Sequence, residues 1–472
     1  MYSEQFQFTF AVVTKMKFFK PLFIILCFAL SIVSCRKDVF ITDTSVKINF
    51  SKDTLTFDTV FTSIGSATRF FKVFNPYSKK IKISSIKLAG GDQSHFRINV
   101  DGISTIEAND VEIAAHDSMY IYAAVTVDPN NDANPFVIED SILFETNGNN
   151  QKVILNAWGQ NAHFYYDSVI VADQHWVNDL PYVIINSMII DSNVTVTIDP
   201  GCRIYNHPHS LIGVKGKLIV NGTAADTVFF RGDRLENYFQ DLPGQWGGII
   251  ILPGSTGSLM EYTTLQDGDI GVWADDSVLY AQPHVALKQV VIKNMTYAGI
   301  RGISAWVEGE NTLVYNCGQN NCLQVLIGGK YRFTNCTFVD YSNIAINHQD
   351  PAVYLSNYFT ADQVNYFFGG CDAKFENCII WGGLDEELAL DFLGTAAGDA
   401  IFDSCCIKTD STLSASSTWF KQDPKFISTT NENYRLQFGS PCVGSGKTNL
   451  LTVDLDGLAR PLGHIDIGCY ER

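Results

Sequence analysis

The sequence predicts an all-β protein in which an antiparallel β-sandwich is followed by a parallel β-helix. The 472 residues include 32 Phe and 20 Tyr, and aromatic and β-branched residues favour strands. The first part of the chain alternates apolar and polar residues between turn signals, which indicates paired strands with one buried face. The second part repeats short apolar triplets, which is typical of a solenoid. At this length two or three domains are expected.

The N-terminal stretch, residues 17–35, reads KFFKPLFIILCFALSIVSC. Basic residues, a short apolar run and small residues before a cysteine predict a secretory signal within residues 1–35 rather than a membrane-spanning helix. The end of this stretch resembles the lipobox of bacterial lipoproteins, which implies cleavage before Cys35 and lipidation of Cys35. We expect translation to start at Met16. A buried apolar helix with an incidental cysteine is the alternative.

Lipidation at Cys35 would anchor the exported protein to a bacterial membrane, since two or more acyl chains hold a protein there stably. The polar residues 36–45 are expected to form a tether, and we expect an outer-membrane or cell-surface location. The formal net charge of −17 argues against nucleic-acid partners, whose binding proteins need a positive surface.

Residues 46–160 contain seven or eight short alternating runs over about 115 residues, which predicts an antiparallel β-sandwich. The order of FFKVFNPYSKKIKISSI, AGGDQSHFRI, SMYIYAAVTVDP and VILNAWG resembles the immunoglobulin-like (Ig-like) domains of the hydin and abnormal-spindle type. The resemblance implies a spacer or an interaction module, and no residue pattern in this segment indicates chemistry.

Residues 161–430 repeat apolar triplets separated by Gly, Asn and Asp at a spacing of roughly 20–27 residues, as solenoid repeats do. An Asn or Ser followed by Cys recurs at one place in the repeat. We expect the Asn side chains to bond the turn backbone and the Cys side chains to fill the core in stacked columns. The recurring pairs are Asn316-Cys317, Asn335-Cys336, Asn377-Cys378 and Ser404-Cys405.

The segments VTIDPG, LIVNGT and WGGI resemble the opening turns of right-handed parallel β-helices of the pectin-lyase-like group. Polysaccharide lyases of that group hold Ca²⁺ with an acidic cluster and remove a proton with a basic side chain, and its hydrolases use sets of carboxylates. The best candidates here for a catalytic or Ca²⁺ site are Asp267, Asp269, Asp275 and Arg301. The alternative is that Asp and Gly only mark turns.

Three tryptophans of the second part are candidate platforms on which sugar rings could stack: Trp246, Trp273 and Trp306. The acidic segment LDEELALDF, which includes Asp385, Glu386, Glu387 and Asp391, is expected to form a short amphipathic helix with its acids in solvent.

Ten cysteines follow Cys35, and an exported protein permits disulfides. Their recurrence indicates buried apolar filling, and no zinc-type spacing is present. Pairings of Cys442 with Cys469, and of Cys317 with Cys322, stay open.

Residues 431–472 are expected to form a C-terminal cap. DLDGLARPLGHIDIGCYER, with NYRLQFGSPCVGSG before it, resembles the closing segment of exported β-helix proteins. The cluster of Asp454, Arg460, His464 and Asp466 resembles an active site, but a solenoid must cover its end. Buried pairing of Arg460 with an aspartate would serve that purpose.

The sequence thus predicts a lipid-anchored surface protein whose β-helix binds glycan or another surface polymer. Two alternatives remain: a polysaccharide lyase or glycoside hydrolase, and a structural or adhesive protein without a saccharide ligand. We expect binding rather than catalysis, and no cofactor other than Ca²⁺ is indicated. Fold alone does not choose among these functions.

Overall fold

The computed structural model describes residues 39–472 apart from residues 63, 129–135, 277–280, 320, 395, 397, 412 and 417. In this part of the chain the regular structure is β-strand except for one 3₁₀ turn, η1 (Gly91–Gln93), so the prediction of an all-β fold is confirmed. Among the same residues, no helix is long and apolar enough to cross a membrane. The lipobox and Cys35 lie outside the described residues.

The described residues divide into two compact units, and the first is a β-sandwich. Its two five-stranded sheets have the orders β1-β3-β8-β5-β6 and β2-β10-β9-β4-β7. Inward positions are apolar, as along β4, where Ile81, Ile83, Ile86 and Leu88 are buried. The strands are β1 (Asn49–Phe50), β2 (Thr54–Phe61), β3 (Arg69–Phe74), β4 (Ile81–Leu88), β5 (Phe96–Val100), β6 (Ile103–Thr105), β7 (Glu107–Ile113), β8 (Ser118–Val125), β9 (Phe136–Thr146) and β10 (Asn149–Gln160).

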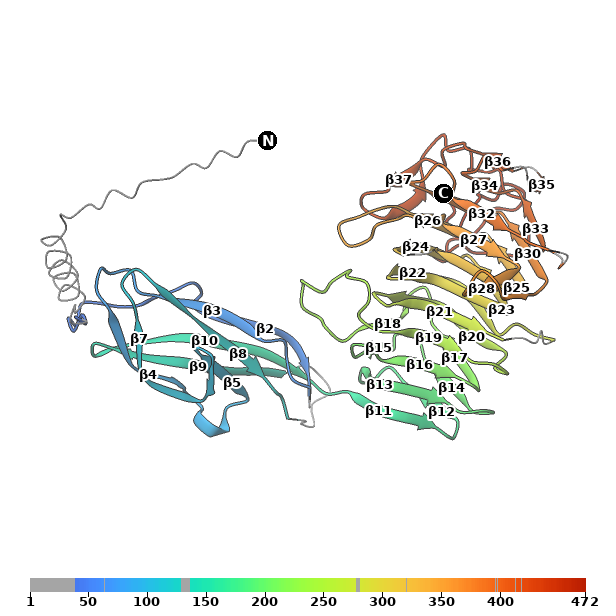
Figure 1. Ribbon diagram of the computed structural model, residues 1–472. Coiled ribbons are helices and arrows are strands. Elements are labelled where there is room, and N and C mark those ends of the chain that lie inside the picture. Colours follow the sequence, from blue (N-terminus) through green and yellow to red (C-terminus); the bar gives the residue numbers. More distant parts are fainter. Residues whose placement is uncertain are drawn as a thin grey trace, which may run out of the picture. The chain divides into compact units, whose positions relative to one another are not determined.

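The second unit is a parallel β-helix, as predicted. Its short strands stack turn upon turn in one 24-stranded sheet (Figure 1). One series of equivalent strands runs β13, β16, β19, β21, β23, β25, β27 and β32, and each pairs in parallel with the next.

The strands of this sheet are β11 (His163–Ile170), β12 (Gln174–Trp176), β13 (Tyr182–Ile190), β14 (Thr195–Ile198), β15 (Arg203–Asn206), β16 (Leu211–Val214), β17 (Lys217–Asn221), β18 (Val228–Gly232), β19 (Gly248–Ile251), β20 (Ser258–Gln266), β21 (Ile270–Asp275), β22 (Val285–Met295), β23 (Ala298–Glu310), β24 (Leu313–Cys317), β25 (Leu323–Thr334), β26 (Thr337–Asp340), β27 (Val353–Ser356), β30 (Cys371–Glu376), β31 (Ile379–Gly382), β32 (Leu388–Asp391), β33 (Gly398–Asp403), β34 (Cys406–Ile407), β35 (Ser414–Ser416) and β36 (Trp419–Phe420).

Like side chains form columns inside the β-helix. Phe333, Phe375 and Phe402 are buried and stack with ring centroids 5.4 and 5.1 Å apart. At the corner beside this column, the predicted Asn and Ser residues all have φ between 52° and 55°: Asn316, Asn335, Asn377 and Ser404. Asn tolerates this left-handed conformation better than most residues. The Cys that follows each of them is buried, which confirms the predicted columns.

All ten cysteines of the described residues are free and buried, so the pairing of Cys442 with Cys469 is wrong. Cys442 lies instead beside the thiol of Cys406. The backbone N–H of Cys469 donates to Thr337 Oγ1 at 3.1 Å, on a different turn of the helix. Each thiol therefore fills its own place in the core and faces a partner other than the expected one.

The C-terminal segment begins with the antiparallel pair β37 (Phe426–Ser428) and β38 (Asn433–Leu436). The buried Arg460 guanidinium forms an ion pair with Glu471 at 2.7 Å and also donates to Gly468 O at 3.0 Å. The expected partner, Asp466, accepts instead from the N–H groups of Gly444 and Arg472. These groups are fully engaged in holding the segment, which supports a capping role for it.

Candidate functional site

Four side chains form an outward-facing column on the series of strands that contains β21, β23, β25 and β27. Strand register aligns Trp273 with Arg301, Arg301 with Gln324, and Gln324 with Tyr354. The residues on either side of each of these four are buried, because successive residues of a strand point to opposite faces. The sequence therefore places one aromatic ring, one guanidinium, one amide and one phenol on successive turns.

Three members of this column line a cavity of about 470 Å³, called here the Arg301 cavity. One wall comes from the connection between β26 and β27. Another comes from β28 (Tyr358–Thr360), which pairs antiparallel with β29 (Tyr366–Phe368) as a hairpin. The lining residues are Arg301, Asn321, Gln324, Leu326, Asp350, Pro351, Tyr354, Tyr358, Phe359 and Thr360.

The Arg301 side chain lies between an aromatic ring and a carboxylate. Its guanidinium carbon lies 4.8 Å from the centre of the Trp273 ring, a cation–π distance. Burial lowers the pKa of Arg301, and the charge of Asp275 opposes that shift. Burial likewise raises the pKa of Asp275, and Arg301 opposes it. The Arg301 Nε and Trp273 Nε1 atoms are buried and, within the described part of the chain, have no hydrogen-bond partner. A ligand in the cavity would find donors that are not already committed.

Two tyrosines of the cavity share one carboxylate. The hydroxyls of Tyr354 and Tyr358 donate to Asp391 Oδ2 at 2.8 and 2.7 Å. Burial raises the pKa of Tyr354, and the hydrogen bond to Asp391 adds to the shift, so this hydroxyl keeps its proton. Asp391 thus fixes the direction of both rings. The sequence did not predict this arrangement, since the three residues come from separate turns.

The helix predicted for LDEELALDF is wrong. Residues 388–391 form strand β32, paired in parallel with β27. Glu387 is fully buried, and Glu386 accepts hydrogen bonds from Thr409 and the N–H of Asp410. The stacking of the preceding turn determined the conformation here, and the helical spacing of the acids did not.

The predicted acidic cluster does not come together as one site. Asp267 is buried, has a φ of 65° and accepts hydrogen bonds from Gln266 and Asn294. It continues the column of Asn residues at the corner of the helix. Asp269 lies at the turn before β21, where burial raises its pKa and a hydrogen bond with Thr296 opposes the shift. Only Asp275 neighbours Arg301.

A metal site is not formed by these carboxylates. Among the residues that the structure describes, no group of three or more His, Cys, Asp and Glu side chains is arranged to hold a metal ion. Asp267 points into the corner column, so it is not available to complete such a group with Asp269 and Asp275.

The three candidate tryptophans occupy different environments. Trp246 is fully buried and donates to Gln266 O at 2.9 Å, so it offers no face to a ligand. Trp306 is covered by Lys330, whose Nζ lies 3.6 Å from the ring centre. Trp273 is the one of the three that stands beside Arg301.

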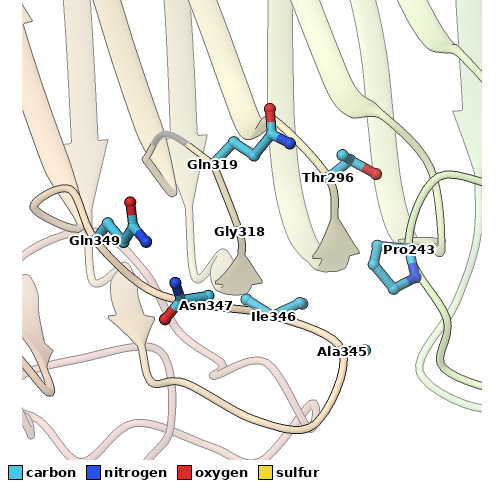
Figure 2. Close-up of a pocket in the computed structure, with 8 residues that line it drawn as sticks. All are labelled: Pro243, Thr296, Gly318, Gln319, Ala345, Ile346, Asn347 and Gln349. Carbon is cyan, nitrogen blue, oxygen red and sulfur yellow. The ribbon is translucent and has the colours of Figure 1, made fainter. Parts of the chain in front are cut away.

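A second cavity, called here the amide cavity, has a volume of about 510 Å³ (Figure 2). Thr296, Gln319, Asn347 and Gln349 supply hydroxyl and amide groups, and no charged side chain lines it. The other lining residues are Pro243, Gly318, Ala345 and Ile346. The connection between β26 and β27 contributes to this cavity as well as to the Arg301 cavity.

No protein-family model matches the sequence, and no curated protein matches it. Three solved structures are similar to parts of the chain, all at low scores. The catalytic unit of a thermostable GH87 α-1,3-glucanase from Streptomyces thermodiastaticus is 10% identical with a TM-score of 0.31, over 74% of this chain and 75% of that one.

The other two similar structures cover about a quarter of this chain. The ASH/PapD-like domain 7 of human CEP192 is 13% identical with a TM-score of 0.17, over 27% of this chain and 94% of that one. A family 123 glycoside hydrolase from Clostridium perfringens is 8% identical with a TM-score of 0.18, over 28% and 30%. At such scores the fold rests on the strand pairing described above, and the activities of these proteins are not transferred to this chain.

Proposed function

We propose that this chain is an exported lipoprotein whose β-helix binds a glycan in the Arg301 cavity. One observation carries the proposal: the outward column of Trp273, Arg301, Gln324 and Tyr354 opens into a cavity walled by the aromatic residues of β28. Ligand sites are typically concave and combine aromatic surface with a few placed polar groups.

The chemistry of the lining suits a sugar. The apolar faces of sugar rings can pack on the rings of Tyr358 and Phe359, while sugar hydroxyls need donors and acceptors such as Asn321 and Gln324. Arg301 adds five N–H donors and a positive charge, which would suit a carboxylate on the glycan.

The solenoid geometry favours a polymer over a small ligand. Neighbouring strands of a sheet lie about 4.8 Å apart, so Arg301, Gln324 and Tyr354 on three successive turns span about 10 Å along the helix axis. The column continues beyond the cavity to Trp273 on the preceding turn. Successive sugar units would meet equivalent positions on successive turns.

The anchoring part of the proposal rests on the sequence. The lipobox resemblance assigns lipidation to Cys35 and an outer-membrane or cell-surface location, and the first unit would serve as an Ig-like spacer. Cys35→Ser should move the protein from the membrane fraction to the soluble fraction. Cys27→Ser, inside the apolar run of the signal, is the matched control and should leave it anchored. Continued membrane association of Cys35→Ser would refute the anchor.

Glycan binding is tested by retention of the mature chain on a panel of neutral and uronate-containing polysaccharides. We expect retention of wild type, loss of retention in Arg301→Ala and Phe359→Ala, and unchanged retention in Arg203→Ala. Arg203 is the matched control because it occupies an outward position of β15, outside the cavity. Silence of the wild type across the panel, or equal retention by Arg301→Ala, would overturn the proposal.

The same panel addresses the enzymatic alternative. Release of reducing ends or unsaturated products from a retained polysaccharide, measured with and without Ca²⁺, would favour a hydrolase or a lyase over a binding protein.

A further inference from the structure

The connection between β26 and β27, residues 341–352, contributes to the walls of both cavities. Ala345, Ile346, Asn347 and Gln349 line the amide cavity, as Figure 2 shows. Asp350 and Pro351 line the Arg301 cavity. The position of this one segment therefore sets the shape of two cavities at once, and His348 stands between the two sets of lining residues.

His348 turns inward from this connection and is buried between two carboxylates. Its Nε2 lies 3.1 and 3.0 Å from the two carboxylate oxygens of Glu387, and its Nδ1 lies 3.5 Å from Asp340 Oδ2. The side chains of all three are at most 1% exposed. Asp340 closes β26 and Glu387 precedes β32, so the imidazole joins the connection to two turns of the β-helix.

Backbone donors fix both carboxylates. Glu387 accepts from Ala352 N–H at 3.0 Å and Leu384 N–H at 2.7 Å, and Asp340 accepts from Cys317 N–H at 3.1 Å. Asp340 Oδ1 and His348 Nδ1 have no hydrogen-bond partner within the described residues. The cluster thus has rigid acceptors on the helix side, and its one basic group is on the connection.

Other titratable groups also surround the cluster. Asp350 lies on the same connection, Cys322 Sγ lies 3.8 Å from Asp340 Oδ2, and the charge of Glu387 is felt at Tyr341. Tyr434 of β38 faces Asp340 and Cys322. Lys408, after β34, accepts the Glu387 N–H through its carbonyl, while its ammonium donates to Gly382 O. Among these neighbours, no cation is recorded in contact with Glu387 or Asp340 except His348.

We infer that His348 is a positioning residue which fastens the connection 341–352 to the β-helix, and that this fastening is firm in acid and neutral solution and loosens in alkaline solution. Its regulation of glycan binding rests on the function proposed above, whereas the fastening itself does not. His348 touches neither cavity and acts through the segment that carries it.

The direction of the pH effect follows from the two shifted groups. Burial raises the pKa of Asp340 to about 7, with His348 opposing. Burial opposes a charged His348, but the hydrogen bond with Glu387 and the charges of Asp340, Glu387 and Asp350 outweigh it, so the pKa of His348 is raised. Both pKa values lie above those of the unfolded chain, so both contributions are full in acid and are lost as the pH rises through the folded-state values. Above them, the cluster holds two buried carboxylates and a neutral imidazole.

The decisive experiment is hydrogen–deuterium exchange of backbone amides in residues 341–352 at several pH values between about 6 and about 9, corrected for intrinsic exchange. In the wild type we expect exchange to rise about tenfold across this range, as one pKa unit of coupling would give. His348→Gln should exchange fast at every pH. Asp340→Asn, which stays neutral, should extend slow exchange to higher pH.

The matched control is His207→Gln, because His207 also forms an ion pair with a buried aspartate, Asp233, at 2.6 Å, but outside the connection. It should leave exchange in residues 341–352 unchanged. Far-UV circular dichroism checks that each variant is folded. Slow exchange in folded His348→Gln, or a wild-type profile without pH dependence, would overturn the inference.

Glycan retention at the same pH values separates the two proposals. We expect retention to fall in alkaline solution for the wild type and to persist in Asp340→Asn. If the wild type binds no polysaccharide but shows the exchange pattern, the proposed function fails and the fastening stands. If retention is independent of pH while exchange changes, the connection does not regulate the site.

Discussion

The Arg460 guanidinium bonds Asn311 Oδ1 through Nη2 at 2.7 Å and Nε at 3.3 Å, although 149 residues separate the two in the chain. The contact is one of a series. Lys447 exchanges hydrogen bonds with Asn377, Asn449 donates to Asn335, and Val453 O accepts from Asn311. The C-terminal segment therefore runs back along the side of the β-helix, over the corner where the Asn column lies, in addition to closing its end.

Removal of the buried Arg460 charge should strongly destabilise the β-helix. Arg460→Ala leaves Glu471 buried without its partner, which typically costs about 3–5 kcal/mol. Arg435→Ala is the matched control, because its pair with Asp456 is more than a third exposed on average and such pairs contribute at most about 1 kcal/mol. Urea unfolding of the two variants measures the difference. Equal losses of unfolding free energy would contradict the structural role of Arg460.

Two adjacent glycines should respond differently to alanine. A Cβ at Gly382 would overlap the Glu387 carboxylate and Asp340 O, whereas one at Gly383 would meet Tyr341 and His348 at ordinary distances of 3.7 and 3.9 Å. Gly382→Ala should therefore cost at least about 2 kcal/mol and speed exchange in residues 341–352, while Gly383→Ala changes stability little. Thermal unfolding measures both. A tolerated Gly382→Ala would show that the carboxylate is not held where described.

Loss of the Asp391 charge should weaken glycan binding. Asp391→Asn replaces the acceptor that orients Tyr354 and Tyr358, and hydrogen bonds to a charged group contribute about 1.5–3 kcal/mol each. We expect retention to drop about tenfold, with unfolding free energy reduced by a smaller amount because the site is half-buried. Asp385→Asn, an exposed acid of the preceding turn, is the control and should behave as wild type. An equal effect of both substitutions would point to general charge and not to ring orientation.

The described cysteines should be unreactive toward a thiol reagent in the native protein. All ten are buried, and burial raises the pKa of Cys202 to about 11 and those of Cys371 and Cys469 to about 12. The thiolate is the reactive form, so we expect no rapid labelling at neutral pH and ten further labelled sites after unfolding without reductant. Fewer sites after unfolding would reveal disulfides among them.

The columns of the β-helix were predictable because they recur in the sequence. Asn316, Asn335 and Asn377 each precede a Cys at the same place of the repeat, and in the structure they share the left-handed conformation. A repeated signal is legible even when each copy is weak.

The cavities were not predictable because each joins residues that do not recur. Tyr354 and Asp391 are 37 residues apart, and His348 and Glu387 are 39 apart. Their meeting depends on the length of each intervening turn. The acids at 385–391 have a helical spacing, yet parallel pairing with β27 imposed a strand. Asp267 had the features of a catalytic acid, and only the stack shows it to be part of the Asn column.

The backward course of the C-terminal segment has a consequence for synthesis on the ribosome. Turns around Asn311, Asn335 and Asn377 emerge long before residues 447–460, which complete their hydrogen bonds. Contacts of such large sequence separation form late and slowly. A chain interrupted before residue 447 would therefore hold unfinished turns throughout its middle, and a single late translational error could be detected by proteases as readily as an early one.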